Sequence, residues 1–332
     1  MSADPQRICI VGAGRMGEGI ALAFMFAGLP VTLIDIKQRE PVAQDRYFRQ
    51  IEGHLRGELA SLARLGSLDP AQVEQAMSHL RLSDREGSGD DLHSAAVVFE
   101  AVPEVLELKA LTFAWLSAAC GDETVIASTT STFLVTQLAA LVTHPQRFVN
   151  AHWLNPALLM PLVEVSRSKD TCPQVVQRLM ALLKRIGKVP VQCSPAAGYI
   201  VPRIQALAMN EAARMVEEGV ASAEDIDTAI RVGFGLRFSV LGMLEFIDWG
   251  GGDILFYASH YLAEAIDPRF LPPKVIAENM AQGRNGLREG QGFYDYQDVD
   301  LEAYKLQRLG EFTRKLELMG LSPVFNGGVA TS

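Results

Sequence analysis

The chain has 332 residues, which exceeds the usual size of a single hydrophobic core and predicts two domains. Hydrophobic residues make up 48% and charged residues 21%, as in ordinary globular proteins with a sizeable core. The formal net charge of −9 argues against general binding to nucleic acid, whose phosphates an acidic protein repels. An anionic ligand held at a local basic or amide-rich site remains compatible with this charge.

The cysteines and the apolar stretches indicate in which cellular compartment the protein is expected. The chain has four scattered cysteines, Cys9, Cys120, Cys172 and Cys193. Their spacing is not that of a metal site, so we expect free thiols and no metal ion. The opening residues, MSADPQR, lack the basic and apolar pattern of a signal peptide. The longest apolar stretch, 20–34, is broken by Gly28 and Pro30, which indicates a helix, a turn and a strand and not a membrane span. We therefore expect a cytoplasmic protein without membrane contact.

Up to about residue 190, short apolar runs alternate with longer amphipathic stretches. We expect strands at 8–11, 31–34, 97–100, 125–127, 148–151, 162–165 and 189–191. Helical patterns occupy 15–27, 105–118 and 173–186, with a charge-rich helical insertion between 40 and 66 and a further helix from about Pro70. This alternation predicts an α/β fold, a Rossmann-type doubly wound sheet that is largely parallel.

The pattern changes near Cys193-Ser194-Pro195, after which helices dominate. They are expected at 201–219, 223–232, 243–249, 254–265, 271–282 and 301–319. Gly219, Gly233 and Gly235 are expected to end helices. The predicted organisation is an α/β domain over 1–194, an all-helical domain over 195–320 and a tail over 321–332.

A glycine-rich turn indicates a dinucleotide site. IVGAGRMGEGIA places Gly12, Gly14 and Gly17, with Met16 among them, between the first strand and the first helix. That spacing suits a tight turn, a close approach of backbone to pyrophosphate, and close packing of helix on strand. The free N–H groups of the helix then face the anion. The alternative is an accidental glycine-rich turn.

Asp35 ends the second predicted strand, where a carboxylate can bind the ribose hydroxyls of the cofactor. A carboxylate there repels a 2′-phosphate, so we expect NAD and not NADP. Lys37 and Arg39 follow closely and could weaken this preference.

A histidine and a glutamate lie in unusually apolar surroundings. His152 ends the run 148–151, and Glu164 lies within a second run, after a turn that Asn155-Pro156 predicts. An ionisable group in such a segment costs several kcal/mol unless it is paired. A carboxylate on one ring nitrogen fixes the tautomer and leaves the other nitrogen free to act as a base. A structural ion pair, or two unrelated polar residues at strand ends, fits these residues equally well.

Three segments, together with the glycine turn, resemble the L-3-hydroxyacyl-CoA dehydrogenase family. NAHWLNPALLMPLVEV has the family's His-x-x-Asn-Pro signature, followed by a glutamate twelve positions after the histidine. In FEAVPEVLELK, Glu104 and Lys109 match positions beside the nicotinamide ribose. In STTST, Ser131 matches the serine that binds the substrate oxygen. Later segments, GYIVPRI, EAARMVEEGVAS and GQGFYDY, follow the family's helical domain.

The resemblance implies reversible, NAD-dependent oxidation of the 3-hydroxyl of a short-chain L-3-hydroxyacyl-CoA. It implies His152 as the base, Glu164 as the group that orients it, and Ser131 as the donor to the substrate oxygen. It also implies a homodimer whose helical domain caps the substrate. Taken alone, Ser131 could cap a helix, Glu104 could be an ordinary first-turn acid, and Lys109 a solvated residue.

Two departures concern the substrate. Pro202 stands where the family has an active-site asparagine, whose contacts could come instead from Asn155 or Asn210. The serine and lysine that hold the CoA nucleotide in the family have no match here. The corresponding positions and their basic neighbours are His54, Ser61, Arg56 and Arg64. Of these, Arg56 is our candidate for meeting the phosphates of CoA.

The segment 233–251 is more similar to the gulonate and carnitine dehydrogenases, relatives that act on free 3-hydroxy acids. Arg237 within it could bind a substrate carboxylate, and an interface salt bridge explains it equally well. The alternatives are therefore a dehydrogenase of a free 3-hydroxy acid and a non-catalytic, crystallin-like NAD(H)-binding protein. A 6-phosphogluconate-type enzyme would need a helical lysine as base, for which no convincing equivalent is found.

Overall fold

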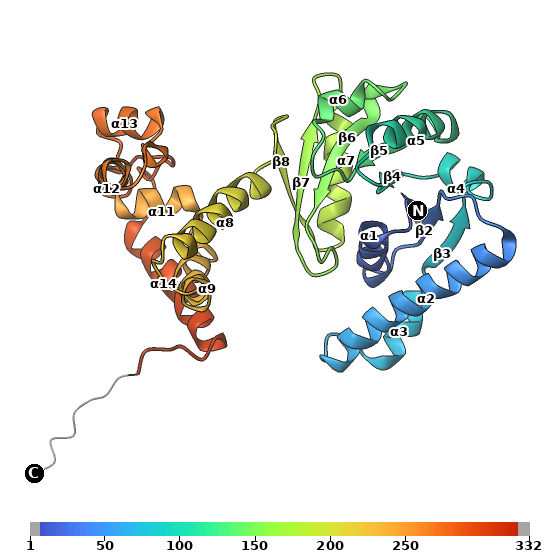
Figure 1. Cartoon of the computed structure of the whole chain (residues 1–332), viewed down its shortest axis with the longest axis horizontal. Coiled ribbons are helices and arrows are strands. Elements are labelled where there is room, and N and C mark those ends of the chain that lie inside the picture. The colour runs from blue at the N-terminus through green and yellow to red at the C-terminus, as the bar shows by residue number, and fades with distance from the viewer. Residues whose placement is uncertain (1–6, 325–332) are drawn as a thin grey trace, which may run out of the picture. The chain divides into compact units, whose positions relative to one another are not determined.

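The computed structural model describes residues 7–324. The chain separates into two compact units, Met1–Ala208 and Met209–Ser332, and helix α8 (Val201–Glu217) crosses the division (Figure 1). The domain boundary expected between 194 and 195 stays a prediction. Of the expected tail, 321–324 has no helix or strand, and 325–332 lies outside the described residues.

Over the described residues, eight strands of the first unit form one sheet in the order β3-β2-β1-β4-β5-β6-β7-β8. The strands are β1 Ile8–Val11, β2 Val31–Asp35, β3 Leu80–Asp84, β4 Val97–Glu100, β5 Val125–Ser128, β6 Phe148–Trp153, β7 Leu162–Arg167 and β8 Val189–Cys193. Every neighbouring pair is parallel except β6 with β7, which is antiparallel. The predicted doubly wound sheet is confirmed.

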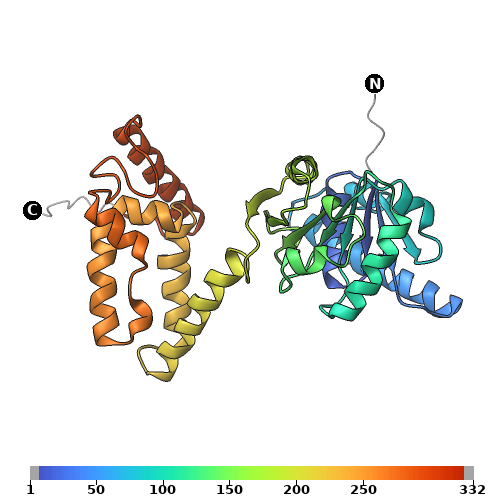
Figure 2. The same cartoon turned by 90° about the horizontal axis from the view of Figure 1, so that it is seen from above.

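Helices cover both faces of this sheet (Figure 2). Side chains alternate along β1, so that Ile8 and Ile10 pack on one face and Cys9 and Val11 on the other. The first face packs against α1 Arg15–Phe26, α2 Pro41–Arg64, α3 Pro70–Met77 and α7 Pro173–Arg185. The second packs against α4 Gly89–His93, α5 Leu106–Ala119 and α6 Val135–Ala139. Burial on both faces explains why the central strands are almost continuously apolar.

Strand β3 was not expected from the sequence. It lies at the edge of the sheet and pairs with β2 alone, from Leu80 beside Val31 to Asp84 beside Asp35. An edge strand is only partly covered, and the residues of β3 are mostly half-buried. Its weak apolar signal therefore reflects its position.

The second unit is helical, as expected. After α8, its helices are α9 Ala223–Ala229, α10 Leu236–Phe238, α11 Met243–Gly250, α12 Gly252–Ala265, α13 Lys274–Ala281 and α14 Leu301–Leu318. Short 3₁₀ turns occur at Pro145–Arg147 in the first unit and Pro268–Phe270 in the second. Within residues 7–324, no helix has both the length and the apolar character needed to cross a membrane.

The expectation that Gly233 and Gly235 end a helix was wrong. The chain passes from α9 through a π-helical turn, Ile230–Gly235, directly into α10. In this wide turn the carbonyl oxygen of Ile230 lies where it would be 3.0 Å from a Cβ on Gly235. Glycine is thus used for close backbone approach inside the helix. Gly219, by contrast, follows α8 with a φ of +68° and does end it.

Candidate active site

A cavity of about 810 Å³ opens along the carboxyl edge of the sheet. It includes the point where β1 lies between β2 and β4 and the strand order reverses, the usual ligand position in this architecture. Most of the site residues predicted from the sequence line it, namely Gly12, Gly14, Met16, Asp35, Glu104, Lys109, Ser131, His152 and Asn155. These residues come from segments far apart in the chain, and the fold brings them to one edge.

The turn after β1 has the close contacts that a dinucleotide site requires. Gly12 has a φ of +112°, and a Cβ on it would lie 2.6 Å from the carbonyl oxygen of Ala101. A Cβ on Gly17 would lie 1.9 Å from the carbonyl oxygen of Gly12. The absence of a side chain at Gly17 therefore lets the start of α1 pack closely against the turn. Gly14 has open space where its Cβ would be. This arrangement fits the pyrophosphate of NAD at the N-terminus of α1.

Asp35 is buried at the end of β2, and its carboxylate accepts hydrogen bonds from neighbouring protein groups. Its carboxylate accepts the Arg39 Nε–H at 2.7 Å, the Lys37 backbone N–H at 3.2 Å and the Gln44 side-chain amide at 3.4 Å. The Arg39 guanidinium also lies over the ring of Tyr47, 4.0 Å from its centroid. The basic neighbour therefore pairs with the proposed ribose ligand, a contact that the sequence did not establish.

His152 and Glu164 face each other across the antiparallel pair β6–β7. His152 Nδ1 lies 2.8 Å from Glu164 Oε2, and both residues are buried. The other carboxylate oxygen of Glu164 accepts the backbone N–H groups of Ile200 and Val201, each at 2.9 Å. Both oxygens of Glu164 thus have protein partners, and His152 is one of the cavity's lining residues.

Ser131 and Glu104 belong to a second set of hydrogen-bonded residues at the cavity. Glu104 Oε1 accepts the backbone N–H of Ser131 at 2.7 Å, the hydroxyl of Thr130 at 2.7 Å and the hydroxyl of Ser131 at 3.3 Å. Its Oε2 lies 3.1 Å from Lys109 Nζ. Burial alone would raise the pKa of Glu104, but the Thr130 hydrogen bond and the Lys109 charge outweigh it and lower this pKa.

Glu100 belongs to this site and was missed in the sequence. It ends β4 fully buried, and its two oxygens lie 2.9 and 3.1 Å from Lys109 Nζ. Ser128 and the backbone N–H of Val102 also donate to it. Burial raises the pKa of Glu100, against the lowering effect of Lys109. Glu164 was identified as an ionisable residue in an apolar segment, and Glu100, at the end of the apolar run VVFE, could have been identified in the same way.

A further buried cation shapes the turn after β6. Lys188 Nζ donates to the carbonyl oxygens of Ala157, Leu158 and Met160 at 2.6, 2.8 and 3.0 Å. The Asn155–Pro156 peptide bond that begins this turn is cis. Lys188 therefore organises the segment in which Asn155 lies.

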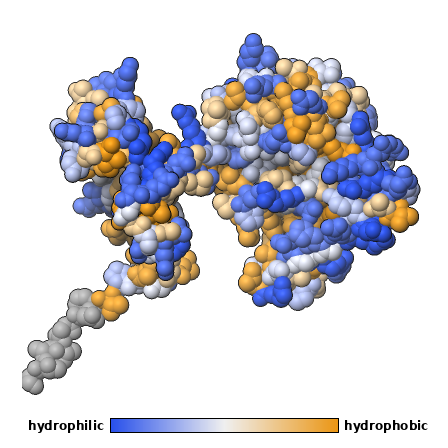
Figure 3. All heavy atoms as spheres, viewed as in Figure 1, coloured by the Kyte–Doolittle hydropathy of each residue, from blue (hydrophilic) through white to orange (hydrophobic). Residues whose placement is uncertain are grey.

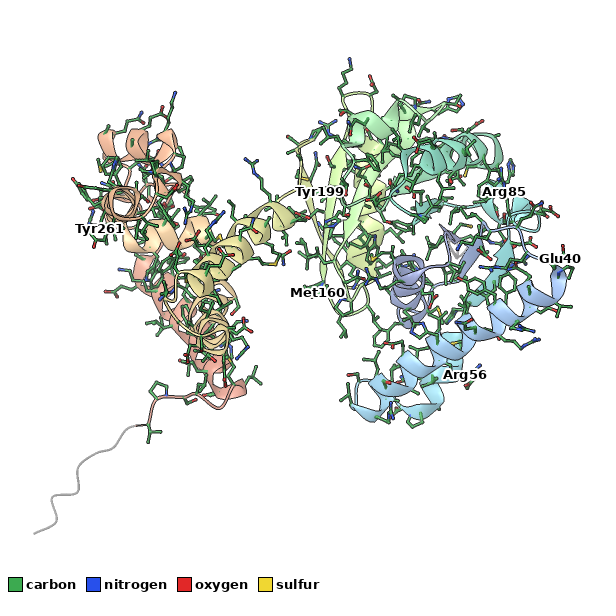
Figure 4. The ribbon with its side chains drawn as sticks, viewed as in Figure 1. Glu40, Arg56, Arg85, Met160, Tyr199 and Tyr261 are labelled. Carbon is green, nitrogen blue, oxygen red and sulfur yellow. The ribbon has the colours of Figure 1, made fainter. Side chains whose placement is uncertain are left out.

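The candidate CoA residues do not line the cavity. Arg56 lies exposed on α2 (Figure 4). It pairs with Glu74 on α3. His54 pairs with Glu18, and Arg64 donates to Ser61. Pro202 does line the cavity, together with Gln205 one turn further along α8. Asn210 and Arg237 belong to the second unit, where Arg237 lies over the ring of Phe246.

Two family models match the chain. The NAD binding domain of 3-hydroxyacyl-CoA dehydrogenase matches residues 7–196, and the C-terminal domain of the same enzyme matches residues 198–296. The chain belongs to the 3-hydroxyacyl-CoA dehydrogenase family. It is an NAD-dependent oxidoreductase of that type, and the predictions of family, enzyme class and cofactor are confirmed.

Relatives within the 3-hydroxyacyl-CoA dehydrogenase family differ in the substrates that they are named for. The 5-formyl-3-hydroxy-2-methylpyridine 4-carboxylate 5-dehydrogenase of Mesorhizobium japonicum is 30% identical over 94% of this chain and 98% of its own. A probable 3-hydroxybutyryl-CoA dehydrogenase of Bacillus subtilis is 30% identical over 88% of this chain and 98% of its own. Among solved structures, a 3-hydroxyacyl-CoA dehydrogenase of Archaeoglobus fulgidus is 28% identical, with a TM-score of 0.75, over 96% of this chain and all of its own.

Proposed function

We propose that this family member reversibly oxidises the 3-hydroxyl of a short-chain L-3-hydroxyacyl-CoA to the ketone, using His152 and Glu164 as the acid–base pair. The observation that supports this most is the 2.8 Å contact between His152 Nδ1 and a buried carboxylate, at a cavity that also includes Ser131 and the nucleotide turn. Bound NAD supplies the hydride acceptor, and NADH the hydride donor.

The proton is handled by the protein's own groups. Glu164 accepts the Nδ1–H of His152, which leaves Nε2 to take the hydroxyl proton and to return it in the reducing direction. Ser131 donates to the substrate oxygen, where negative charge develops. Asn155 offers its amide to the substrate. Arg56 is proposed to meet the CoA phosphates, for which it would have to leave Glu74, its partner outside the cavity. General acid–base assistance of this kind typically contributes about 10²–10⁴-fold.

The cofactor is proposed to lie along the rest of the same cavity. The turn of Gly12, Gly14 and Gly17, with Met16, receives its pyrophosphate, and Asp35 receives the adenosine ribose. Glu104 contacts both Lys109 and Ser131, and we propose that Glu104 and Lys109 lie beside the nicotinamide ribose.

The test is a histidine-to-glutamine pair of variants. His152→Gln should lose about 10²–10⁴-fold in turnover and keep wild-type NADH affinity, because the base is removed and the nucleotide turn is untouched. His144→Gln, an exposed histidine in a loop, is the matched control and should behave as wild type. Turnover of His152→Gln close to the wild-type rate would rule out the assignment.

A free carboxylic acid is the second candidate substrate. It is favoured by the Mesorhizobium japonicum relative, which is named for a pyridine carboxylate, and by the pairing of Arg56 with Glu74 away from the cavity. NADH oxidation with acetoacetyl-CoA, beside acetoacetate and dehydrocarnitine at equal concentration, separates the two. Turnover with the thioester alone supports the CoA substrate, and turnover with a free acid alone supports the second candidate.

We also propose that the protein is a homodimer formed through its helical unit. Large apolar side chains of this unit are exposed, among them Tyr261 and Leu306, each more than 70% exposed, and apolar residues are visible on its surface in Figure 3. Sedimentation velocity tests this proposal, with Leu306→Asp expected to shift the protein towards monomer. A wild-type protein that sediments as a monomer at micromolar concentration would contradict it.

A further inference from the structure

We propose that Tyr199 is a positioning residue, which holds the His152 imidazole and the Ser131 turn in one fixed arrangement for proton transfer. The proposal rests on the proposed role of His152 as the proton acceptor. Three separate features of Tyr199 support it: the placement of its ring, the partners of its hydroxyl and its backbone conformation.

The ring of Tyr199 stacks on the ring of His152. Their centroids are 4.7 Å apart and their planes differ by 15°. The hydrogen bond to Glu164 holds only one ring nitrogen, so the imidazole could still tilt about that contact. An aromatic face packed flat against it removes this freedom. Glu164 thus sets the tautomer of His152, and Tyr199 sets the plane in which its other nitrogen lies.

The hydroxyl of Tyr199 joins the His152 strand to the Ser131 turn. It donates to the carbonyl oxygen of Thr130 at 2.8 Å and accepts the side-chain N–H of Asn150 at 3.0 Å. Asn150 lies on β6, two residues before His152, and Thr130 immediately precedes Ser131. Burial raises the pKa of Tyr199, so the hydroxyl keeps the proton that it donates. One side chain therefore links the strand of the proposed base to the turn of the proposed substrate donor.

The backbone of Tyr199 is in a conformation that non-glycine residues rarely adopt. Its φ is +48°, directly after Gly198 with a φ of +77°. This reversal turns the tyrosine ring towards His152 and presents the next two N–H groups to Glu164. One short segment thus contacts both members of the pair. Backbone conformations of this kind persist where the surrounding contacts demand them, and they concentrate at functional sites.

The first test compares turnover per NADH-binding site in Tyr199→Phe, Tyr199→Leu and the control Tyr294→Phe, an exposed tyrosine of the second unit. Losing the two hydrogen bonds of the hydroxyl should lower kcat about fivefold in Tyr199→Phe. Losing the ring as well should lower it about 10²-fold in Tyr199→Leu, with NADH affinity unchanged. NADH deuterated at C4 should give a larger isotope effect in both variants if hydride and proton transfer have become slower. Fewer binding sites with wild-type kcat and isotope effect per site would show a purely structural role and overturn the proposal.

The second test needs no turnover. In protein labelled with ¹³C at the histidine rings, the His152 signal is assigned as the one missing in His152→Gln. The stacked tyrosine should shift this signal upfield, an effect retained in Tyr199→Phe and lost in Tyr199→Leu. An identical His152 signal in Tyr199→Leu would overturn the positioning role. If Tyr199→Leu does not fold, the kinetics of Tyr199→Phe decide. Failure of the proposed function is seen separately, as full activity in His152→Gln.

Discussion

Three charged side chains at the cavity, those of Asp35, Glu104 and Lys109, are bonded to other protein groups, and Asp35 shows what this means for cofactor choice. Its carboxylate is shared between Arg39, the Lys37 backbone and Gln44. Held in this way, it presents a fixed acceptor to the ribose hydroxyls and a fixed negative charge to any 2′-phosphate. The same carboxylate takes the Nε–H of Arg39 and offsets its charge, so Arg39 attracts a phosphate less while Asp35 is present.

Replacing Asp35 with serine should therefore change the cofactor preference. NADH should bind about 10- to 100-fold more weakly, because hydrogen bonds to a charged acceptor are lost. The affinity for NADPH should fall much less, because the carboxylate that repels the 2′-phosphate is gone and Arg39 is released from it. Fluorescence titration of both cofactors measures the ratio. Equal losses for NADH and NADPH would contradict the ribose role of Asp35.

The carboxylate of Glu104 gives a prediction about pH. Its pKa in the folded protein is lowered from 4.5, with the Thr130 hydrogen bond as the largest lowering contribution. The stability from ionised Glu104 is thus fully present above about pH 4.5 and is lost as the pH falls through the lowered pKa. Thr130→Val removes that hydrogen bond and should lower the free energy of unfolding at neutral pH. The difference between the two proteins in free energy of unfolding should become smaller in acid, where Glu104 is protonated in both.

Urea unfolding at a series of pH values from neutral to about pH 3 measures this difference. Thr130→Ser keeps the hydroxyl and serves as the control, so its free energy of unfolding should stay close to that of the wild type at every pH. A difference between Thr130→Val and wild type that is the same at every pH would show that the valine acts through packing or the turn alone, and not through the charge on Glu104.

At the scale of elements, the apolar runs predicted the central strands, because these strands are buried on both faces and need continuous apolar sequence. Strand β3 escaped because an edge strand needs no such run. The glycine turn and the His152–Glu164 pair were predictable because each motif is local or lies in two adjacent strands. The contact of Tyr199 with His152 was not, since 47 positions separate them and the positive φ that joins them leaves no mark in the sequence. Only the folded chain brings such residues together.

The turn between β1 and α1 offers a matched pair of glycine substitutions. Gly17→Ala should destabilise the protein by about 3 kcal/mol, because its Cβ would lie 1.9 Å from a backbone oxygen that cannot move away. Gly14→Ala has open space and a φ of −105°, so its stability should stay within about 0.5 kcal/mol of wild type. The methyl group of Gly14→Ala should instead hinder the approach of the pyrophosphate and weaken the binding of NADH. Urea unfolding and NADH titration separate the two effects, and equal stability of both variants would contradict the packing role of Gly17.

For the whole molecule, the residues proposed to receive the cofactor belong to the first unit, Met1–Ala208, so we expect cofactor binding to stabilise this unit directly. The three tryptophans can report on the units separately. Trp115 lies on α5 and Trp153 on β6 in the first unit, whereas Trp249 lies on α11 in the second. Labelling with 5-fluorotryptophan gives one ¹⁹F signal for each, which single substitutions to phenylalanine assign.

NAD⁺ at a hundred times its Kd should stabilise the first unit by about 2.7 kcal/mol, because it binds the folded form only. For a unit of this size the corresponding rise in Tm is roughly 5–10 °C. The melting of the Trp115 and Trp153 signals should move by this amount, and that of Trp249 should move by much less. A common Tm for all three signals, moving together when NAD⁺ is added, would instead show that the two units unfold as one cooperative body. The helical unit would then share in the stabilisation through its link to the first.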